Sequence, residues 1–484
     1  MTNAANPAPS PRVLVAVLTL AGITVSLQQT SVILLLPQLP RLLDASPADT
    51  SWAITATLLA GAVSIPTFGR LADMWGKRRM LLVCLGMLVA GSVTAALSTS
   101  LAWLVVGRAM QGMGAAVVSL GISLMRDQLH PQRLVTATAL MSTSLGVGGS
   151  LGLPLSALLA QYANWRVLFW AAAGLGALSV VLVLLTVPES KQRTGGRFDL
   201  VGALLLAGML VCLLLAISEG GARGWGSPVV VGLYVAAAVL VVTFGRWELR
   251  TPQPLIDLHV SRRAQVLLTN TTSIVFGYAM LTSSLVLSQL LQLPTTTGYG
   301  FGEPIVVAGL LQAPGGLCMM AMSPVSARLT AAQGPRTTLM VGALVIASGY
   351  GFSALFHSQI WHLLLSAGVV GSGIGLGYAA MPSLIMGAVP VTQTASANSL
   401  NNLCRCLGTS IASAMAGLLL ATMTTTVGNE TVPSRTAFVT VLLIGAAAAL
   451  LALLLAAFIP RRCTAPPAGP APALRQSGLG SSPL

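Results

Sequence analysis

One stretch decides how the chain is organised: Gly69-Arg70-Leu71-Ala72-Asp73-Met74-Trp75-Gly76-Lys77-Arg78-Arg79. It holds four cations, one carboxylate and two glycines, in a chain of which only 7% is charged. Two long apolar runs, 50–68 and 80–97, flank it on either side. We therefore expect a tight basic loop between two membrane-spanning segments.

The composition extends this expectation to the whole chain. Of the 484 residues, 55% are hydrophobic, and the mean hydropathy is +0.84. Apolar runs of about 20 residues cross a bilayer as helices. The runs here are continuous rather than alternating, which argues against a β-barrel. The composition therefore predicts an all-α polytopic membrane protein.

The pattern of apolar runs predicts fourteen spans, at residues 13–36, 50–68, 80–98, 102–124, 135–160, 167–187, 199–217, 228–246, 264–291, 305–326, 337–357, 361–386, 392–422 and 434–459. An even number of spans places both termini on the same side. Most of the 25 lysines and arginines then fall on that side, and these fall on the other: Arg41, Arg166, Arg223 and Arg435. Because cytoplasmic loops carry the excess of positive charge, we expect a bacterial inner-membrane protein with both termini in the cytoplasm.

The net charge of +14 also admits nucleic-acid binding. We reject nucleic acid as a partner because the cations lie in short loops between spans, so that the lipid bilayer is the expected partner. The six cysteines form no CxxC pair, and the histidines lie in loops or at span ends. We therefore expect no disulfide framework, no metal and no cofactor. We expect a monomer.

A fainter copy of the basic stretch occurs at Ala327–Arg336. The residues that recur at the same spacing are Arg70, Leu71, Gly76 and Arg78, matched by Arg328, Leu329, Gly334 and Arg336. Each copy lies between the second and third spans of a set of six. We predict these parts: a cytoplasmic segment (1–12), a six-helix bundle (13–190), two additional helices (191–250), a second six-helix bundle (251–460) and a disordered cytoplasmic tail (461–484). Two related bundles around a midplane site are typical of transporters.

Three motifs carry a resemblance to a known family. The basic stretch resembles the loop signature G-x-L-A-D-x-x-G-[RK]-[RK] of the major facilitator superfamily, with matches at Gly69, Leu71, Ala72, Asp73, Gly76, Lys77 and Arg78. Arg108–Ala115 is similar to the R-x-x-Q-G-x-G-A pattern of proton-coupled exporters, and Gly146–Ala157 resembles the G-P-x-x-G-G core of the antiporter motif. The chain is similar to the fourteen-span drug:proton antiporters. This resemblance implies a major facilitator fold, with 14 transmembrane helices in two six-helix bundles plus two extra helices.

One position departs from this family. Many of its members carry an Asp in the first span, in a pattern like L-D-x-T, where this chain has Leu27-Gln28-Gln29-Thr30. The amide of Gln28 can form hydrogen bonds but cannot titrate. The departure argues against a proton carrier in this span and against selectivity for cationic substrates.

The resemblance also implies roles for individual residues. A conformational latch on the cytoplasmic side is implied for Gly69, Asp73, Gly76, Lys77, Arg78 and Asp127. The alternative is a solvated loop that only orients the protein. Arg108 is implied in proton coupling, and its alternative is a structural cation bonded to carbonyl groups. An antiporter-type helix is implied for Gly148, Gly152 and Pro154, whose alternative is ordinary packing of small residues. Arg405, inside the thirteenth span, admits a functional and a structural interpretation equally.

The substrate cavity is the least defined part of the sequence. The family topology implies that the first, fourth, ninth and twelfth spans line it. The polar or bulky candidates are Gln28, Gln29, Gln111, Asn270, Tyr278 and Tyr378, joined by Asn398 and Asn401 from the thirteenth span. The alternative for each is a hydrogen bond between helices. Met319 and Met320 are expected in the core.

These observations predict proton-coupled efflux of hydrophobic drugs or antibiotics by alternating access. The expected partners are therefore a hydrophobic small molecule and protons. The alternative is a lipid or apolar-metabolite exporter with weak or no proton coupling, favoured by Gln28 and by the lack of an acid at mid-depth in any span. We do not expect an enzyme, because the chain has no HExxH motif, no Ser/His/Asp set in the spans and no phosphate-binding loop.

Overall fold

The computed structural model describes residues 10–31, 39–43, 45, 50, 52–162, 164–190, 195, 197–252, 254–427 and 430–460. The long helices are α1 (Pro11–Ser31), α4 (Trp52–Trp75), α5 (Lys77–Leu97), α6 (Leu101–Gly112), α7 (Val117–Gln128), α8 (Pro131–Tyr162), α9 (Arg166–Thr186), α10 (Leu200–Arg223), α11 (Pro228–Glu248), α13 (Ala264–Gln292), α14 (Ile305–Gln333), α15 (Pro335–Leu355), α16 (Ile360–Ala388), α17 (Thr394–Thr422) and α18 (Arg435–Ala457). The short elements are α2 (Leu39–Leu43), α12 (Leu258–Ser261), the 3-10 helices η1 (Met113–Ala116), η2 (Thr295–Thr297) and η3 (Val391–Gln393), and the strands β1 (Thr424–Val427) and β2 (Glu430–Pro433).

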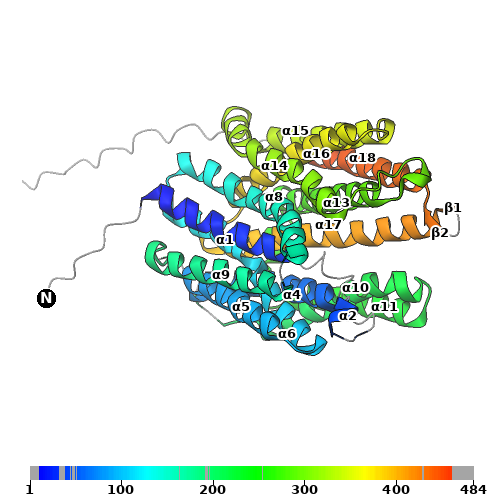
Figure 1. Cartoon of the computed structure of the whole chain (residues 1–484). Helices are drawn as coiled ribbons and strands as arrows, with labels where there is room; N and C mark the ends of the chain where they lie inside the picture. The colour runs from blue at the N-terminus through cyan, green and yellow to red at the C-terminus, as the bar shows by residue number, and fades with distance from the viewer. Residues whose placement is uncertain are drawn as a thin grey trace, which may run out of the picture.

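The number of spanning helices agrees with the sequence. Among the described residues, 13 segments are long and apolar enough to cross a membrane, with α6, η1 and α7 forming one of them. Helix α8 has 32 residues, which is also long enough to span, and it lies among the other helices in Figure 1. Counting α8, the described part of the chain has fourteen spanning helices, which confirms the predicted fold class.

The basic stretch is not a loop, and that prediction was wrong. Helix α4 continues to Trp75 and α5 begins at Lys77, so that Gly76 alone separates the two helices. Gly76 has a φ of 119°, which residues with a side chain rarely adopt. The helix continues through the charged residues because Arg70 and Asp73 are buried against other elements rather than solvated.

A second difference lies between α17 and α18, where β1 and β2 form a short antiparallel hairpin. The hydroxyl of Tyr299 donates a hydrogen bond to the carbonyl of Pro433 and holds this hairpin against the loop that follows α13. The all-α prediction missed the hairpin because four-residue strands give too short a pattern to separate from a loop.

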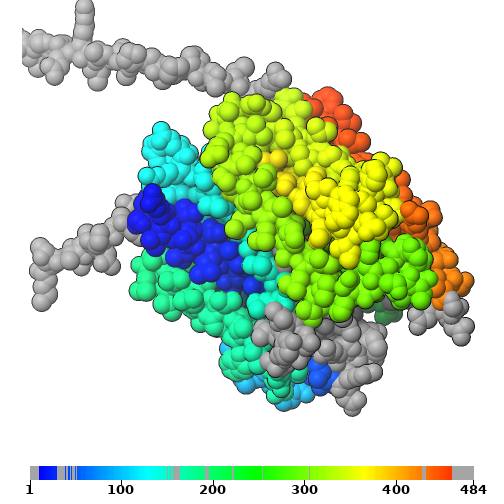
Figure 2. Space-filling view, turned by 45° about the horizontal axis from the view of Figure 1, so that its top comes forward, coloured from blue at the N-terminus to red at the C-terminus, as the bar shows by residue number. Residues whose placement is uncertain are grey.

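The helices run lengthwise in two sets that lie side by side (Figure 1). The first set comprises α1 and α4 to α9, and the last set comprises α13 to α18. Each set is built mainly around its own hydrophobic core. Two crossings join the sets, because α4 packs on α17 and α8 packs on α14. Figure 2 shows the second crossing at the surface, where the cyan residues of α8 border the yellow-green residues of α14.

The two crossings mirror the repeat in the sequence. In each, the second helix of one set packs on the fifth helix of the other. The turn after α14 copies the turn after α4, since Gly334 alone separates α14 from α15 and has a φ of 86°. Helix α14 therefore extends to Gln333, past its predicted end at 326. Ala331 occupies the position that corresponds to Asp73, so only the first copy carries a carboxylate.

The two additional helices lie against the first crossing. Helix α10 packs on both α4 and α17, and α11 packs on α10. Asp199 joins them: its Oδ1 accepts a hydrogen bond from the backbone N–H of Gly202 at 2.8 Å, and Trp247 Nε1 donates to its Oδ2 at 3.0 Å. The pair therefore covers the seam between α4 and α17 from one side.

We predict that Gly408→Ala destabilises the fold. Gly408 on α17 lies so close to the carbonyl of Ile274 on α13 that an added Cβ would overlap it. We expect a lower unfolding temperature of the purified protein, with a loss of about 1–3 kcal/mol, because overpacking forces the two helices apart. Gly417→Ala on the same helix is the control, because nothing lies within 4 Å of a Cβ added there. Equal unfolding temperatures for the two variants would contradict this packing.

Candidate functional site

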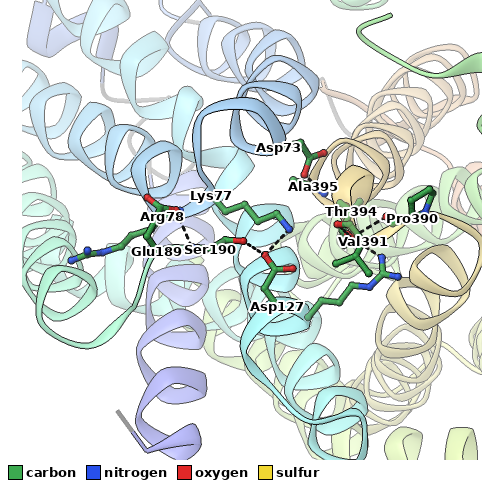
Figure 3. Close-up of polar contacts among 12 residues, drawn as sticks. Asp73, Lys77, Arg78, Asp127, Glu189, Ser190, Pro390, Val391, Thr394 and Ala395 are labelled. Atoms are coloured by element: carbon green, nitrogen blue, oxygen red, sulfur yellow. Dashed lines mark hydrogen bonds and ion pairs between the residues drawn. The ribbon is translucent and has the colours of Figure 1, made fainter. Parts of the chain in front are cut away.

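Asp73 lies where α4 of the first set meets the start of α17 in the last set (Figure 3). Its Oδ2 accepts a hydrogen bond from the backbone N–H of Ser396 at 2.9 Å, and its Oδ1 accepts one from Ala395 at 3.2 Å. The N–H groups in the first turn of a helix have no partner within that helix and carry a partial positive charge. The fully buried carboxylate of Asp73 therefore caps a helix of the other set.

Arg126, near the end of α7, contacts the opposite kind of helix end. Its Nη2 donates to the carbonyl oxygens of Met386 at 2.8 Å and of Val389 at 3.2 Å, where α16 ends. Its Nη1 donates to Oγ1 of Thr394 at 2.6 Å. The last carbonyl groups of a helix carry a partial negative charge, which a guanidinium complements. We call residues 386–396 the α16–α17 turn. The first set contacts this turn through one anion, Asp73, and one cation, Arg126.

The sequence indicates Asp127 for the latch, and Arg126 only as a possible partner of a carboxylate. The signal available in the sequence was a cation in the last turn of a helix. This helix ends at what we call the basic end of the molecule, which is the end that carries Gly76, Lys77 and Arg126. Nothing in the sequence pairs this arginine with carbonyl groups some 260 positions further along the chain. Only the packing of α7 beside α16 and α17 reveals the contact.

The remaining charged latch candidates form a network within the first set. Lys77 Nζ and Asp127 Oδ2 are 2.7 Å apart, and both side chains are almost fully buried. The hydroxyl of Ser190 also donates to Asp127 (Figure 3). Arg78 donates from its backbone N–H to Oε1 of Glu189 at 3.1 Å, which fixes the segment after α9 against the start of α5. These residues brace the α4–α5 turn rather than bridge the two sets.

The two latch glycines are required by close approach. A Cβ on Gly69 would overlap the hydroxyl of Ser399 on α17, so α4 could not lie as close to the last set with a larger residue. Ser399 in turn donates from Oγ to Oγ of Ser119 on α7 at 3.0 Å. A Cβ on Gly76 would come within 2.9 Å of Glu189 Oε1, in addition to the strain of its positive φ.

A cavity lies between the two sets, further along the helices from the basic end. It is bounded by α1, α4, α8, α10, α13, α16 and α17. Most of its lining is apolar, including Leu58, Ile65, Leu145, Leu214 and Met280. The cavity is thus a mostly apolar space at the junction of both sets and one additional helix.

A neighbouring cavity within the last set and α8 shares Gly149, Met280 and Thr409 with the first. Met319 packs in the core of the last set, as expected, and also lines this second space. Met320 is 39% exposed on the outer surface of α14.

Two of the eight predicted cavity residues line the main cavity, namely Gln29 and Tyr378. Gln28 is buried, with 1% of its surface exposed, and is not part of this lining. Tyr278 is also buried, at 5%, and is not part of the lining either. Adjacent glutamines on one helix therefore face different surroundings.

The other four candidates form hydrogen bonds within the protein. Asn401 Nδ2 donates to Oδ1 of Asn270 at 3.0 Å, which joins α17 to α13. Asn398 Nδ2 donates to a carbonyl oxygen one turn earlier in α17 at 3.0 Å. Gln111 Nε2 donates to a serine hydroxyl of α5 at 2.8 Å. These contacts match the alternative interpretation of helix-to-helix or local bonding.

Arg108 is held inside the first set. Its Nε donates to the carbonyl of Ala53 at 3.0 Å, and its Nη1 donates to Oε1 of Gln111 at 2.9 Å and to the carbonyl of Gln28 at 3.4 Å. Only 1% of Arg108 is exposed, and it does not line the main cavity. This geometry is that of a cation bonded to carbonyl groups, while its implied role in proton coupling stays a prediction.

Arg405 has a different environment. It lines the main cavity, and its guanidinium carbon lies 4.6 Å from the ring centre of Tyr378. Its Nη2 donates to Oδ1 of Asn402 at 3.0 Å. Asn402 and Arg405 were both absent from the predicted cavity residues, because an NxxR spacing on a helix gives no sign of which surface it faces.

The small residues of α8 allow close approach to neighbouring helices. A Cβ on Gly148 would lie within 2.7 Å of the carbonyl oxygen of Ile23 on α1, and one on Gly146 would overlap Met319 of α14. Gly152 is buried, and Pro154 lies inside α8 without ending it. The contacts serve helix packing, and they are the same contacts along which a gating movement would slide.

Comparison with known proteins identifies the family. The model of the Major Facilitator Superfamily matches residues 18–413 and 316–481. The chain is 29% identical to the multidrug resistance protein Stp of Mycobacterium tuberculosis (strain CDC 1551 / Oshkosh), over 80% of this chain and 71% of that protein. It is 28% identical to the tetracenomycin C resistance and export protein of Streptomyces glaucescens, over 82% of this chain and 73% of that protein.

A solved structure shares the fold. The crystal structure of the human organic anion transporter MFSD10 (TETRAN) superposes with a TM-score of 0.64, at 18% identity, and the match covers 93% of this chain and 100% of that one. With the family match, the basic motif and the fourteen spanning helices, this shows that the chain belongs to the Major Facilitator Superfamily.

Proposed function

We propose that the protein exports hydrophobic drugs or antibiotics across the bacterial inner membrane, in exchange for protons, by alternating access. The observation that carries this proposal is a mostly apolar cavity between the two sets of helices, with contacts of Asp73 and Arg126 joining the sets at the basic end. Relatives named for multidrug resistance and for tetracenomycin C resistance and export support the class of substrate.

The distribution of charge supports an orientation with the basic end in the cytoplasm. Lys77, Arg78 and Arg126 lie at this end, and the excess of Lys and Arg marks the cytoplasmic side of a membrane protein. Helix α1 begins at the same end (Figure 1), which supports an N-terminus in the cytoplasm. In this orientation, the structure is a state in which access from the cytoplasm is closed.

Opening the cytoplasmic side requires the first set to release the α16–α17 turn. The hydrogen bonds of Asp73 to the start of α17 and those of Arg126 to the turn would break together. A hydrogen bond to a charged group contributes about 1.5–3 kcal/mol, and water replaces part of this loss when the gap opens. A latch of this size can hold one of two states that differ by a few kcal/mol without preventing their exchange.

A second candidate function is export of a lipid or apolar metabolite with weak or no proton coupling. It is favoured by the lining of the main cavity, which contains no Asp or Glu among the described residues. Proton coupling rests on the family resemblance and on the implied role of Arg108.

The two candidates separate in inverted membrane vesicles that contain the protein. We expect ATP-independent uptake of a hydrophobic drug, driven by an imposed pH gradient, to fall to the level of empty vesicles when an uncoupler removes the gradient. Uptake that continues undiminished with the uncoupler would reject the proton-coupled function and leave the second candidate.

Asp73→Asn tests the latch. The change removes the charge that complements the N-terminus of α17 but preserves shape, so we expect transport to fall about tenfold while the amount of protein in the membrane stays the same. The matched control is Glu219→Gln, because Glu219 pairs with Arg223 on a partly exposed surface at the end of α10. Transport by Asp73→Asn equal to that of the control would contradict the latch.

A further inference from the structure

Arg405 is a buried cation whose hydrogen-bonding groups are mostly unused. Only 4% of the residue is exposed. Its Nη2 bonds to Asn402, but its Nε and Nη1 have no acceptor among the residues that the structure describes. It forms no ion pair with any described carboxylate. The face of the guanidinium packs on the ring of Tyr378, which offers a cation–π contact but accepts none of these hydrogen bonds.

Arg108 shows how this fold treats a buried arginine that serves structure. It is equally buried, and three protein oxygens accept hydrogen bonds from it. Its Nε and Nη1 both have acceptors, whereas the same two atoms of Arg405 have none among the described residues. An unpaired buried charge costs several kcal/mol, so a protein that leaves one in place usually brings a partner to it.

The position of Arg405 indicates where the missing partner would bind. Arg405 lines the main cavity, beside polar groups of Gln29 and Asn402 and an apolar wall that includes Leu58 and Met280. The described lining holds no Asp or Glu to balance the charge. The cavity thus combines one uncompensated cation with a large apolar surface.

We propose that this cavity binds amphiphilic organic anions, with an apolar body against the aliphatic wall and a carboxylate or phenolate accepting hydrogen bonds from Arg405. The inference rests on the proposed function and narrows its substrate class from hydrophobic molecules in general to hydrophobic anions.

The test compares two probes that share one apolar body: 1-pyrenebutyrate, which is an anion, and 1-pyrenebutanol, which is neutral. The full-length protein is placed in phosphatidylcholine nanodiscs, and binding is measured by equilibrium dialysis against empty nanodiscs. We expect the anion to bind about tenfold more tightly than the alcohol, because a hydrogen bond to a charged group is stronger than one between neutral groups.

Arg405→Gln should remove this preference: we expect the affinity for the anion to fall about tenfold and the affinity for the alcohol to stay the same. Arg405→Lys should restore part of the affinity for the anion. Arg223→Gln is the matched control, because Arg223 pairs with Glu219 away from the cavity and should leave both affinities unchanged. Removing an unpaired buried charge should also leave the unfolding temperature the same or raise it.

Three results would overturn the anion site. One is equal affinity of the wild-type protein for the two probes, which decides the matter even if Arg405→Gln does not fold. The second is an equal loss of affinity for both probes in Arg405→Gln, which would make Arg405 a structural residue. The third is an anion preference that survives in Arg405→Gln unchanged.

The site and the proposed export function can fail separately. Binding that depends on Arg405 without uptake of pyrenebutyrate into inverted vesicles would reject export and retain the site. Uptake of both pyrene probes at equal rates would retain export and reject the anion site.

Discussion

The contact of the first set with the α16–α17 turn joins the two sets at the basic end of the molecule. Asp73 binds the positive start of α17, and Arg126 binds the negative end of α16. Each charge is therefore paired with backbone groups that would otherwise lack partners. Because Asp73 is buried and Arg126 is partly buried, salt and water weaken these contacts less than they weaken a surface ion pair. The buried ion pair of Lys77 and Asp127 joins the start of α5 to α7, one turn of chain after Asp73.

The two crossings between the sets are related by repeat but differ in chemistry. Where α4 crosses α17, a carboxylate reaches a helix N-terminus. Where α14 crosses α8, Ala331 occupies the corresponding place, and the contact relies on Gly146 against Met319. One crossing is thus held by charge and the other by close packing.

Much of the fold could be predicted from the sequence, because fourteen apolar runs and a repeated basic motif leave few alternatives in a bilayer. The latch motif could also be located, yet its partner could not. The N–H groups of Ala395 and Ser396 carry no side-chain signature, and Arg126 looks like any cation at a helix end. The basic stretch was expected to be a loop because its charges resemble a solvated turn, whereas burial of Arg70 and Asp73 keeps it helical. For the cavity, the sequence gives residue types but not the direction in which each helix faces, which is why Gln29 lines it and Gln28 does not.

The central claim is that the Asp73 carboxylate holds the start of α17 against the first set. Amide hydrogen exchange, followed by mass spectrometry on the full-length protein, measures this directly in the segment 394–399. The account predicts exchange about tenfold or more faster in Asp73→Asn than in the wild-type protein, because asparagine keeps only one of the two acceptor oxygens and loses the charge that complements the start of α17. The first turn of α18, capped by Ser434 within its own set, should exchange equally in both proteins. Unchanged protection of 394–399, or an equal rise in both segments, would contradict the account.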